Sequence, residues 1–201
     1  MKHAVCFIHG FNKTPDTWNQ TEAGKNINIE KIISGKEKVK TLLVRIDNFK
    51  ISPQILVTQL VEQMKSEPNK WTIVCHSLGV VYGLELLNHD ITINGFCLVD
   101  PTSLNEEYIR EITDSSWEEG ATYCLNNFVK KVDYPAKIIF HIHLDYDIQD
   151  QIYFCHQIQY YKQFVGKNTK SKIIVHPGKG HMIHYTDTAK IIESILSLLK
   201  N

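Results

Sequence analysis

Residues 71–80 read WTIVCHSLGV, and this stretch decides the fold. The apolar run Trp71–Cys75 predicts a buried strand, and Leu78–Leu87 predicts a helix that follows it almost at once. Only a tight turn separates the two, and Ser77 stands in it. A buried strand that turns directly into a helix is typical of a parallel sheet covered by helices.

The same alternation of short apolar strands and longer amphipathic stretches continues along the whole chain. The other predicted strands are His3–Ile8, Thr41–Ile46, Gly95–Val99, Lys137–Ile142 and Lys172–Val175. The other predicted helices are Pro53–Met64, opened by Ser52 as a cap, Ile152–Phe164 and Thr186–Leu199. We therefore expect one α/β domain over residues 1–201, a mostly parallel sheet of about six strands with helices on both faces.

One interval, residues 101–134, departs from this pattern. It has weak periodicity, two acidic pairs and isolated aromatic residues, at Tyr108, Trp117, Tyr123 and Phe128. Short surface helices are the simpler interpretation. A lid over a pocket is the alternative, because long connections at the carboxyl edge of a sheet commonly carry function.

Composition excludes several classes of protein. Lys and Arg total 22 against 22 for Asp and Glu, so the basic face that a nucleic-acid-binding protein needs is not expected. No apolar run is long enough to span a membrane, and the N-terminal run is too short for a signal peptide. The five cysteines form no Cys-x-x-Cys pair, which favours reduced thiols and a cytoplasmic location. The sequence does not indicate an oligomeric state.

Three kinds of reactive side chain follow predicted strands in the order serine, aspartate, histidine. Ser77 follows the third strand, an acidic turn at residues 143–147 follows the fifth, and Gly180-His181 follows the sixth. In this order the sequence resembles the α/β-hydrolase superfamily over essentially its full length, and by size its small members. The resemblance implies that Ser77 is a nucleophile and His181 its general base. Cys75 and Val80 depart from the small residues usual at their positions in the motif, whereas Gly79 matches it.

The acid of the triad has three candidates. The resemblance ranks Asp145 first, because it begins the turn after the fifth strand. Asp100 is second, since some lipases of the superfamily take their acid from the preceding strand, and Asp147 is a further alternative. Each aspartate could instead only initiate a turn, and Asp100 before Pro101 is a strong case for that.

Two backbone N–H groups would form the oxyanion hole, according to the same resemblance. They are those of Leu78, after the nucleophile, and of Phe11, after His9-Gly10. His9 is expected to brace its loop by hydrogen bonding. His176 and His184 are rivals of His181 for the role of base.

The predicted function is that of a serine hydrolase that cleaves small carboxylic esters or thioesters, with no cofactor and no metal. One alternative is a binding protein that has the fold without turnover. A less favoured one is a zinc hydrolase that uses His141, His143 and Asp145, spaced to share one face of a strand. Tyr146 stands where the corresponding metal motif has another histidine.

Overall fold

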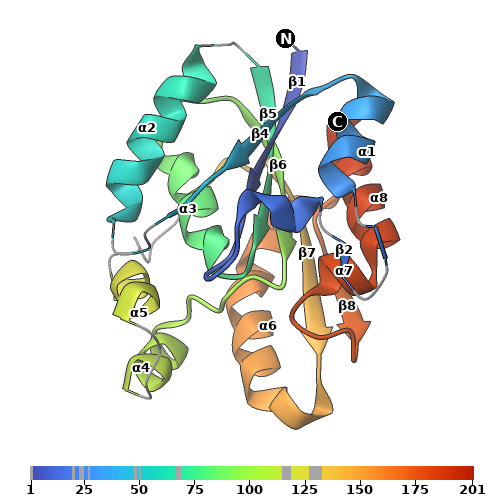
Figure 1. Cartoon of the computed structure of the whole chain (residues 1–201). Helices are drawn as coiled ribbons and strands as arrows, with labels where there is room; N and C mark the ends of the chain where they lie inside the picture. Colours follow the sequence, from blue (N-terminus) through green and yellow to red (C-terminus); the bar gives the residue numbers. More distant parts are fainter. Residues whose placement is uncertain are drawn as a thin grey trace.

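The computed structural model describes residues 2–19, 21–22, 25–26, 28–47, 49, 51–66, 69–114, 119–126 and 133–201. Figure 1 shows a central sheet with helices on both of its sides. Among the described helices, none combines the length and the apolarity that crossing a bilayer requires.

The main sheet has the strand order β4-β1-β5-β6-β7-β8, and every neighbouring pair in it is parallel. Its strands are β1 (Lys2–Ile8), β4 (Lys40–Val44), β5 (Asn69–His76), β6 (Ile93–Val99), β7 (Ile139–Tyr146) and β8 (Lys172–Pro177). A separate antiparallel pair consists of β2 (Thr21–Glu22) and β3 (Lys25–Asn26). Because the main strands are parallel, their carboxyl ends meet at one edge, where the loops that follow β1, β5, β6 and β8 come together.

The helices lie in two layers. Those described are α1 (Ile29–Glu37), α2 (Pro53–Lys65), α3 (Val80–Glu85), α4 (Glu106–Asp114), α5 (Glu119–Asn126), α6 (Gln151–Val165), α7 (Ile183–Thr186) and α8 (Thr188–Leu199). Short 3-10 turns lie at Pro15–Trp18, Ser77–Gly79, Leu86–Asn88 and Ile148–Asp150. Helices α2, α3 and α6 cover one face of the sheet, and α1 and α8 cover the other (Figure 1).

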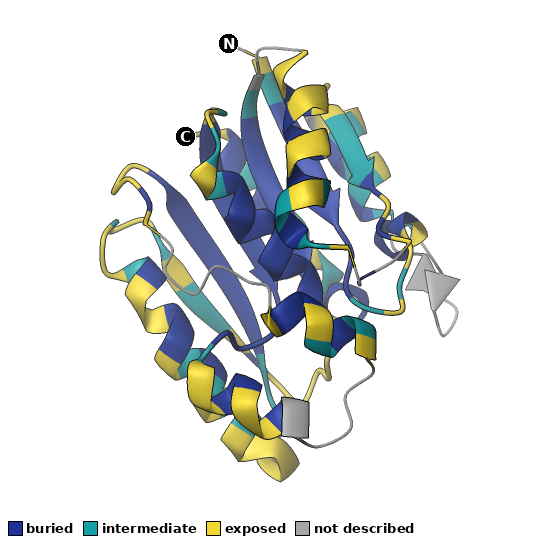
Figure 2. Ribbon diagram, turned by 90° about the vertical axis from the view of Figure 1, so that its left-hand side faces the viewer, coloured by how far each residue is buried: buried dark blue, intermediate teal, exposed yellow. Residues whose placement is uncertain are grey.

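Alternation along β1 shows why the strands are apolar on both sides. Cys6 and Ile8 belong to the core on the α2–α3–α6 face, whereas Val5 and Phe7 belong to the core on the α1–α8 face. All four are fully buried. The central strands therefore appear buried along their length, while the outer faces of the helices are exposed (Figure 2).

The predicted α/β architecture is confirmed, and so are all six main strands. The predicted helices at residues 53–64 and 152–164 are present, and the last helix begins at Thr188 instead of Thr186. Residues 78–87 are divided between two 3-10 turns and the six-residue α3. Helix α1 and the β2–β3 pair were not predicted. β7 continues to Tyr146, four residues beyond its predicted end, which matters for the site below.

In the interval 101–134, the structure describes helices α4 and α5. Both pack on the core through buried side chains that include Ile109, Ile112 and Leu125. Trp117 and Phe128 lie outside the described residues. That this interval acts as a lid stays a prediction.

The aromatic cluster between the sheet and α6 gives a test of the core. Phe140 is fully buried and its ring stacks on Phe96 at 5.0 Å, with Tyr134 and Phe164 also in contact. We expect Phe140→Ala to lower the free energy of unfolding by about 3–5 kcal/mol, through lost burial and a residual cavity. Ile55→Ala, at a position 60% exposed on α2, should change it by less than about 0.5 kcal/mol. Urea denaturation of both variants measures the difference, and equal losses would contradict the described packing.

Candidate active site

Ser77 occupies the turn between β5 and α3 in a left-handed backbone conformation, with φ of 51°. A non-glycine residue there is strained, so the surrounding structure must hold it. Part of that support is the 3.3 Å hydrogen bond that the Thr102 N–H donates to the Ser77 carbonyl. Gly79 is required by space, since a Cβ there would lie 2.5 Å from the carbonyl oxygen of His9.

The structure also accounts for Cys75, which departs from the small residue usual at that position. Its thiol points toward Gly83 of α3, where an added Cβ would lie only 2.2 Å from Sγ. Gly83 thus supplies the space that Cys75 takes, and the strand-to-helix turn stays tight. Cys75 is fully buried, and burial raises the pKa of its thiol well above the ordinary value, so it is not a competing nucleophile.

The His181 imidazole lies between a hydroxyl and a carboxylate. Its Nε2 is 2.8 Å from Ser77 Oγ, and its Nδ1 is 2.5 Å from Asp100 Oδ2. A carboxylate can only accept, so Nδ1–H donates to Asp100 and Nε2 is left to accept the Ser77 hydroxyl proton. The imidazole is 48% exposed and the Asp100 side chain only 2%.

Asp100 directly follows β6, which pairs with β5, the strand that precedes Ser77. Asp100 too has a left-handed backbone, with φ of 39°. Its carboxylate has further donors: Gln157 Nε2 at 3.0 Å and the Asp145 N–H at 3.2 Å both contact Oδ1. A buried charge is tolerated only where such partners exist. The Asp100 N–H in turn donates to the His143 carbonyl at 2.8 Å.

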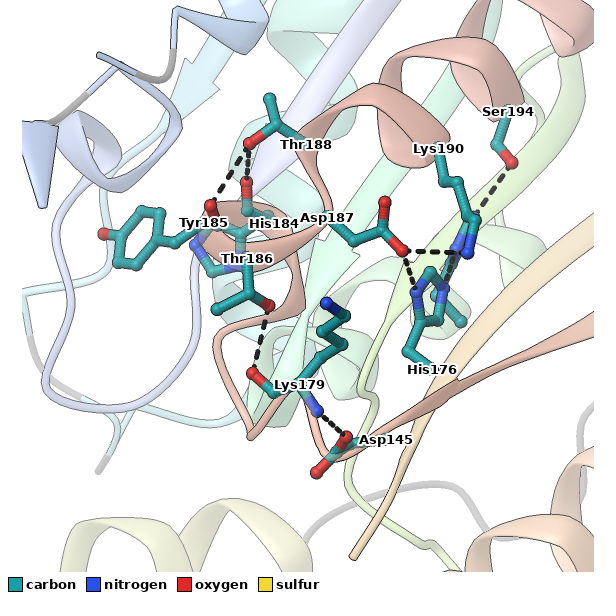
Figure 3. Close-up of polar contacts among 11 residues, drawn as sticks. Asp145, His176, Lys179, His184, Tyr185, Thr186, Asp187, Thr188, Lys190 and Ser194 are labelled. Atoms are coloured by element: carbon teal, nitrogen blue, oxygen red, sulfur yellow. Dashed lines mark hydrogen bonds and ion pairs between the residues drawn. The ribbon is translucent and has the colours of Figure 1, made fainter. Parts of the chain in front are cut away.

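The acid ranked first from sequence, Asp145, does not contact His181; Asp100 takes that position instead. Because β7 runs on to Tyr146, Asp145 is still in the strand, and its Oδ1 accepts the Lys179 N–H at 2.8 Å (Figure 3). Asp147 Oδ1 accepts the Gln149 N–H at 2.9 Å and caps the next turn. Both carboxylates therefore hold backbone N–H groups.

The rival histidines also have other partners. His176 Nδ1 is 2.9 Å from Asp187 Oδ2, and its Nε2 is 2.8 Å from His143 Nδ1 (Figure 3). His184 Nε2 is 3.2 Å from Thr17 Oγ1. His181 is thus the histidine that the structure places against Ser77.

The loop that follows β1 packs directly on the serine. A Cβ on Gly10 would lie 2.8 Å from Ser77 Cβ, so only glycine fits there. His9 braces this loop: its Nδ1–H donates to the Gly10 carbonyl at 2.8 Å, and its Nε2 accepts the Ile46 N–H at 3.0 Å. Phe11 comes next in the chain. The loop that contains Gly10 and Phe11 therefore lies beside Ser77.

The suggested zinc ligands do not form a metal site. His143 is fully buried, and its Nε2 is 2.9 Å from Ser194 Oγ while its Nδ1 faces His176. Across the described part of the chain, no three His, Cys, Asp or Glu side chains are grouped as metal ligands.

A cavity of about 470 Å³ opens above Ser77 and His181. It is lined by Ser77, Asp100, Thr102, Tyr108, Asp145, Asp147, Asp150, Tyr153, Gly180 and His181. Sequence reasoning did not single out Thr102, Asp150 or Gln157, although Thr102 and Gln157 lie in the two segments, residues 102–134 and 153–164, that it expected to shape the pocket. A signal for Asp150 was its position before the predicted helix at residue 152; nothing comparable marked Gln157.

Buried histidines behind the site predict that stability depends on pH. Burial lowers the pKa of His184 to about 3, with the charges of His181 and Lys13 acting in the same direction. In the unfolded chain histidine takes a proton near pH 6.5, so between these values the unfolded state binds more protons. We expect the free energy of unfolding to fall as pH decreases, by up to about 1.4 kcal/mol per pH unit for this residue.

Denaturant unfolding at pH values from 6.5 to 4 measures that slope in the wild type and in His184→Gln, which should have a shallower one. Tyr185→Phe is the matched control, because it changes the neighbouring residue and keeps the buried imidazole. An unchanged slope in His184→Gln would contradict the assignment of a neutral, buried His184.

No known family model matches the sequence, and no curated protein matches it. Solved structures do match. A pyrethroid hydrolase from Sphingobium faniae JZ-2 superposes with a TM-score of 0.67 at 11% identity, over 100% of this chain and 98% of that one. Smu.1393c from Streptococcus mutans gives 0.66 at 14% identity, over 98% and 90%. A thermophilic esterase from Thermogutta terrifontis gives 0.61 at 11% identity, over 100% and 90%. At such identities the similarity establishes a shared fold and nothing finer.

Proposed function

The chain has the α/β-hydrolase fold, as its sequence predicts, and from that premise we propose that it is a serine hydrolase acting on carboxylic esters or thioesters. One observation carries the proposal: the His181 ring lies 2.8 Å from the Ser77 hydroxyl and 2.5 Å from the Asp100 carboxylate. A hydroxyl, an imidazole and a carboxylate in line are the parts that nucleophilic acyl transfer needs. Fold alone would not support an activity.

In the first step, Ser77 Oγ attacks the substrate carbonyl carbon while its proton moves to His181 Nε2. The C–O or C–S bond of the leaving group then breaks, and the imidazolium returns the proton to the departing alcohol or thiol. Water repeats the sequence on the acyl-enzyme, with His181 as base, and releases the acid. Throughout, Asp100 holds the ring orientation and stabilises the positive charge that forms on it.

The tetrahedral intermediate carries an oxyanion, which the backbone N–H groups of Leu78 and Phe11 would bind. Leu78 is in the 3-10 turn that begins at Ser77, and Phe11 follows the glycine packed on Ser77 Cβ. Two fixed donors aimed at that oxygen would contribute several kcal/mol to lowering the barrier.

The cytoplasm is the location that we propose. All five cysteines are free thiols, and Cys155 is exposed, so a reducing compartment suits the chain. A small molecule is the proposed substrate, and a nucleic acid is not, because the net charge is zero.

Covalent labelling tests the nucleophile. A fluorophosphonate probe should label the wild type at Ser77, and Ser77→Ala should lose both labelling and the hydrolysis of p-nitrophenyl esters from acetate to palmitate. Circular dichroism of the variant should match the wild type, because alanine leaves the fold unchanged. Labelling that persists in Ser77→Ala, or equal ester hydrolysis in the two proteins, would disprove the proposed activity.

The identity of the acid is tested by comparing two asparagine variants. Asp100→Asn should lower kcat by about three to four orders of magnitude, because the amide favours the wrong imidazole tautomer. Asp145→Asn keeps an oxygen that can accept the Lys179 N–H, so its loss of kcat should be at least a hundredfold smaller. The reverse ranking would identify Asp145 as the acid after all.

A further inference from the structure

The cavity above Ser77 carries an excess of negative charge. Four of the residues that line it are aspartates, at positions 100, 145, 147 and 150, and its lining within the described part of the chain includes no lysine or arginine. Asp100 is paired with His181. The other three carboxylates are left to act on whatever enters.

These three carboxylates have backbone partners in place of cations. Asp145 accepts the Lys179 N–H at 2.8 Å, Asp147 the Gln149 N–H at 2.9 Å, and Asp150 the Tyr153 N–H at 3.2 Å. Within the described part of the chain, none of these three carboxylates forms an ion pair with a lysine, arginine or histidine. An N–H dipole supports a carboxylate without cancelling its charge.

The lysine that directly precedes Gly180 of the cavity lining does not neutralise the cavity either. Lys179 gives its backbone N–H to Asp145, but its side chain extends away from that carboxylate (Figure 3). The Lys179 ammonium group therefore forms no ion pair with the carboxylate that its backbone binds.

Aromatic rings line the same cavity. Tyr108 and Tyr153 have ring centroids 5.3 Å apart. Burial raises the pKa of both phenols, and the charges of Asp100 and Asp150 add to the effect, so both rings stay neutral. The face of a neutral tyrosine ring attracts cations, including quaternary ammonium groups.

We propose that the ester or thioester cleaved by Ser77 carries a positively charged nitrogen, bound by Asp147 and Asp150 beside the rings of Tyr108 and Tyr153. This inference rests on the proposed function. It does not rest on the aspartates alone, because Ser77 Oγ and the His181 ring open into the same cavity and make it the place where substrate must lie. An anionic substrate would be repelled there, and a neutral one would gain nothing from the carboxylates.

Matched pairs of esters that differ only in charge test the inference. Butyrylcholine and 3,3-dimethylbutyl butyrate place the charge in the leaving alcohol. The p-nitrophenyl esters of 4-(trimethylammonio)butanoate and 5,5-dimethylhexanoate place it in the acyl group. In at least one pair, kcat/KM should favour the cation by about five- to tenfold, and the ratio should fall as salt rises from about 0.02 to 0.5 M.

Variants connect that ratio to the cavity. Asp147→Asn combined with Asp150→Asn keeps an oxygen at each position for the N–H that it caps, and should bring the ratio close to one. Asp90→Asn combined with Asp133→Asn is the matched control, because it removes two negative charges from exposed positions before the amino ends of β6 and β7. That double variant should keep the wild-type ratio.

The outcomes separate this inference from the proposed function. Ser77-dependent hydrolysis with a ratio of one or less in both pairs overturns the cationic substrate and leaves the serine hydrolase intact. If neither ester of a pair turns over, protection of Ser77 from fluorophosphonate decides: choline should slow labelling more than 3,3-dimethylbutanol does, and equal or weaker protection overturns the inference. Absence of labelling removes both proposals together.

Discussion

The contact between His181 and Asp100 is the interaction on which the site depends. An imidazole that is 48% exposed has few packing contacts to fix its orientation, and either nitrogen could carry its proton. The carboxylate beside it is 2% exposed and has Gln157 and a backbone N–H on its other oxygen. Because a buried carboxylate is costly unless it is paired, the ring is held with Nδ1–H toward Asp100 and Nε2 toward Ser77. The buried Asp100 carboxylate thus fixes the orientation of the exposed His181 ring.

The loop that carries His181 is held mainly by polar contacts. It follows β8, the edge strand, and is largely exposed. His76 Nε2 lies 3.1 Å from the His181 carbonyl, and Asp145 binds the Lys179 N–H two residues earlier. Burial and the neighbouring histidines lower the pKa of His76 well below its ordinary value, so this support is a neutral hydrogen bond within the core. Asp145, which the sequence ranked first as the acid, therefore positions the loop that carries His181.

The sequence was sufficient for the sheet because parallel strands buried on both faces must be continuously apolar, and six such runs are present. It was insufficient to identify the carboxylate that contacts His181, because Asp100 and Asp145 both follow apolar runs that end at the same edge. What separates them is three-dimensional: β6 pairs directly with β5, while β7 is one strand further and continues past residue 142. The sequence also could not show that Gly83 leaves space for the Cys75 thiol, since the two residues lie eight positions apart in the chain. Helix α1 was missed because Gly35 and two lysines, Lys31 and Lys36, weaken its apolar pattern.

The charge of the cavity also bears on the acyl transfer that we propose for Ser77. A tetrahedral intermediate places a negative charge on the former carbonyl oxygen, and carboxylates in the same cavity raise the energy of that charge. A neutral ester would meet this cost in full at the transition state. A substrate with its own ammonium group offsets the field of Asp147 and Asp150 while the oxyanion forms. An acidic cavity is therefore compatible with a serine nucleophile when the substrate brings the compensating charge.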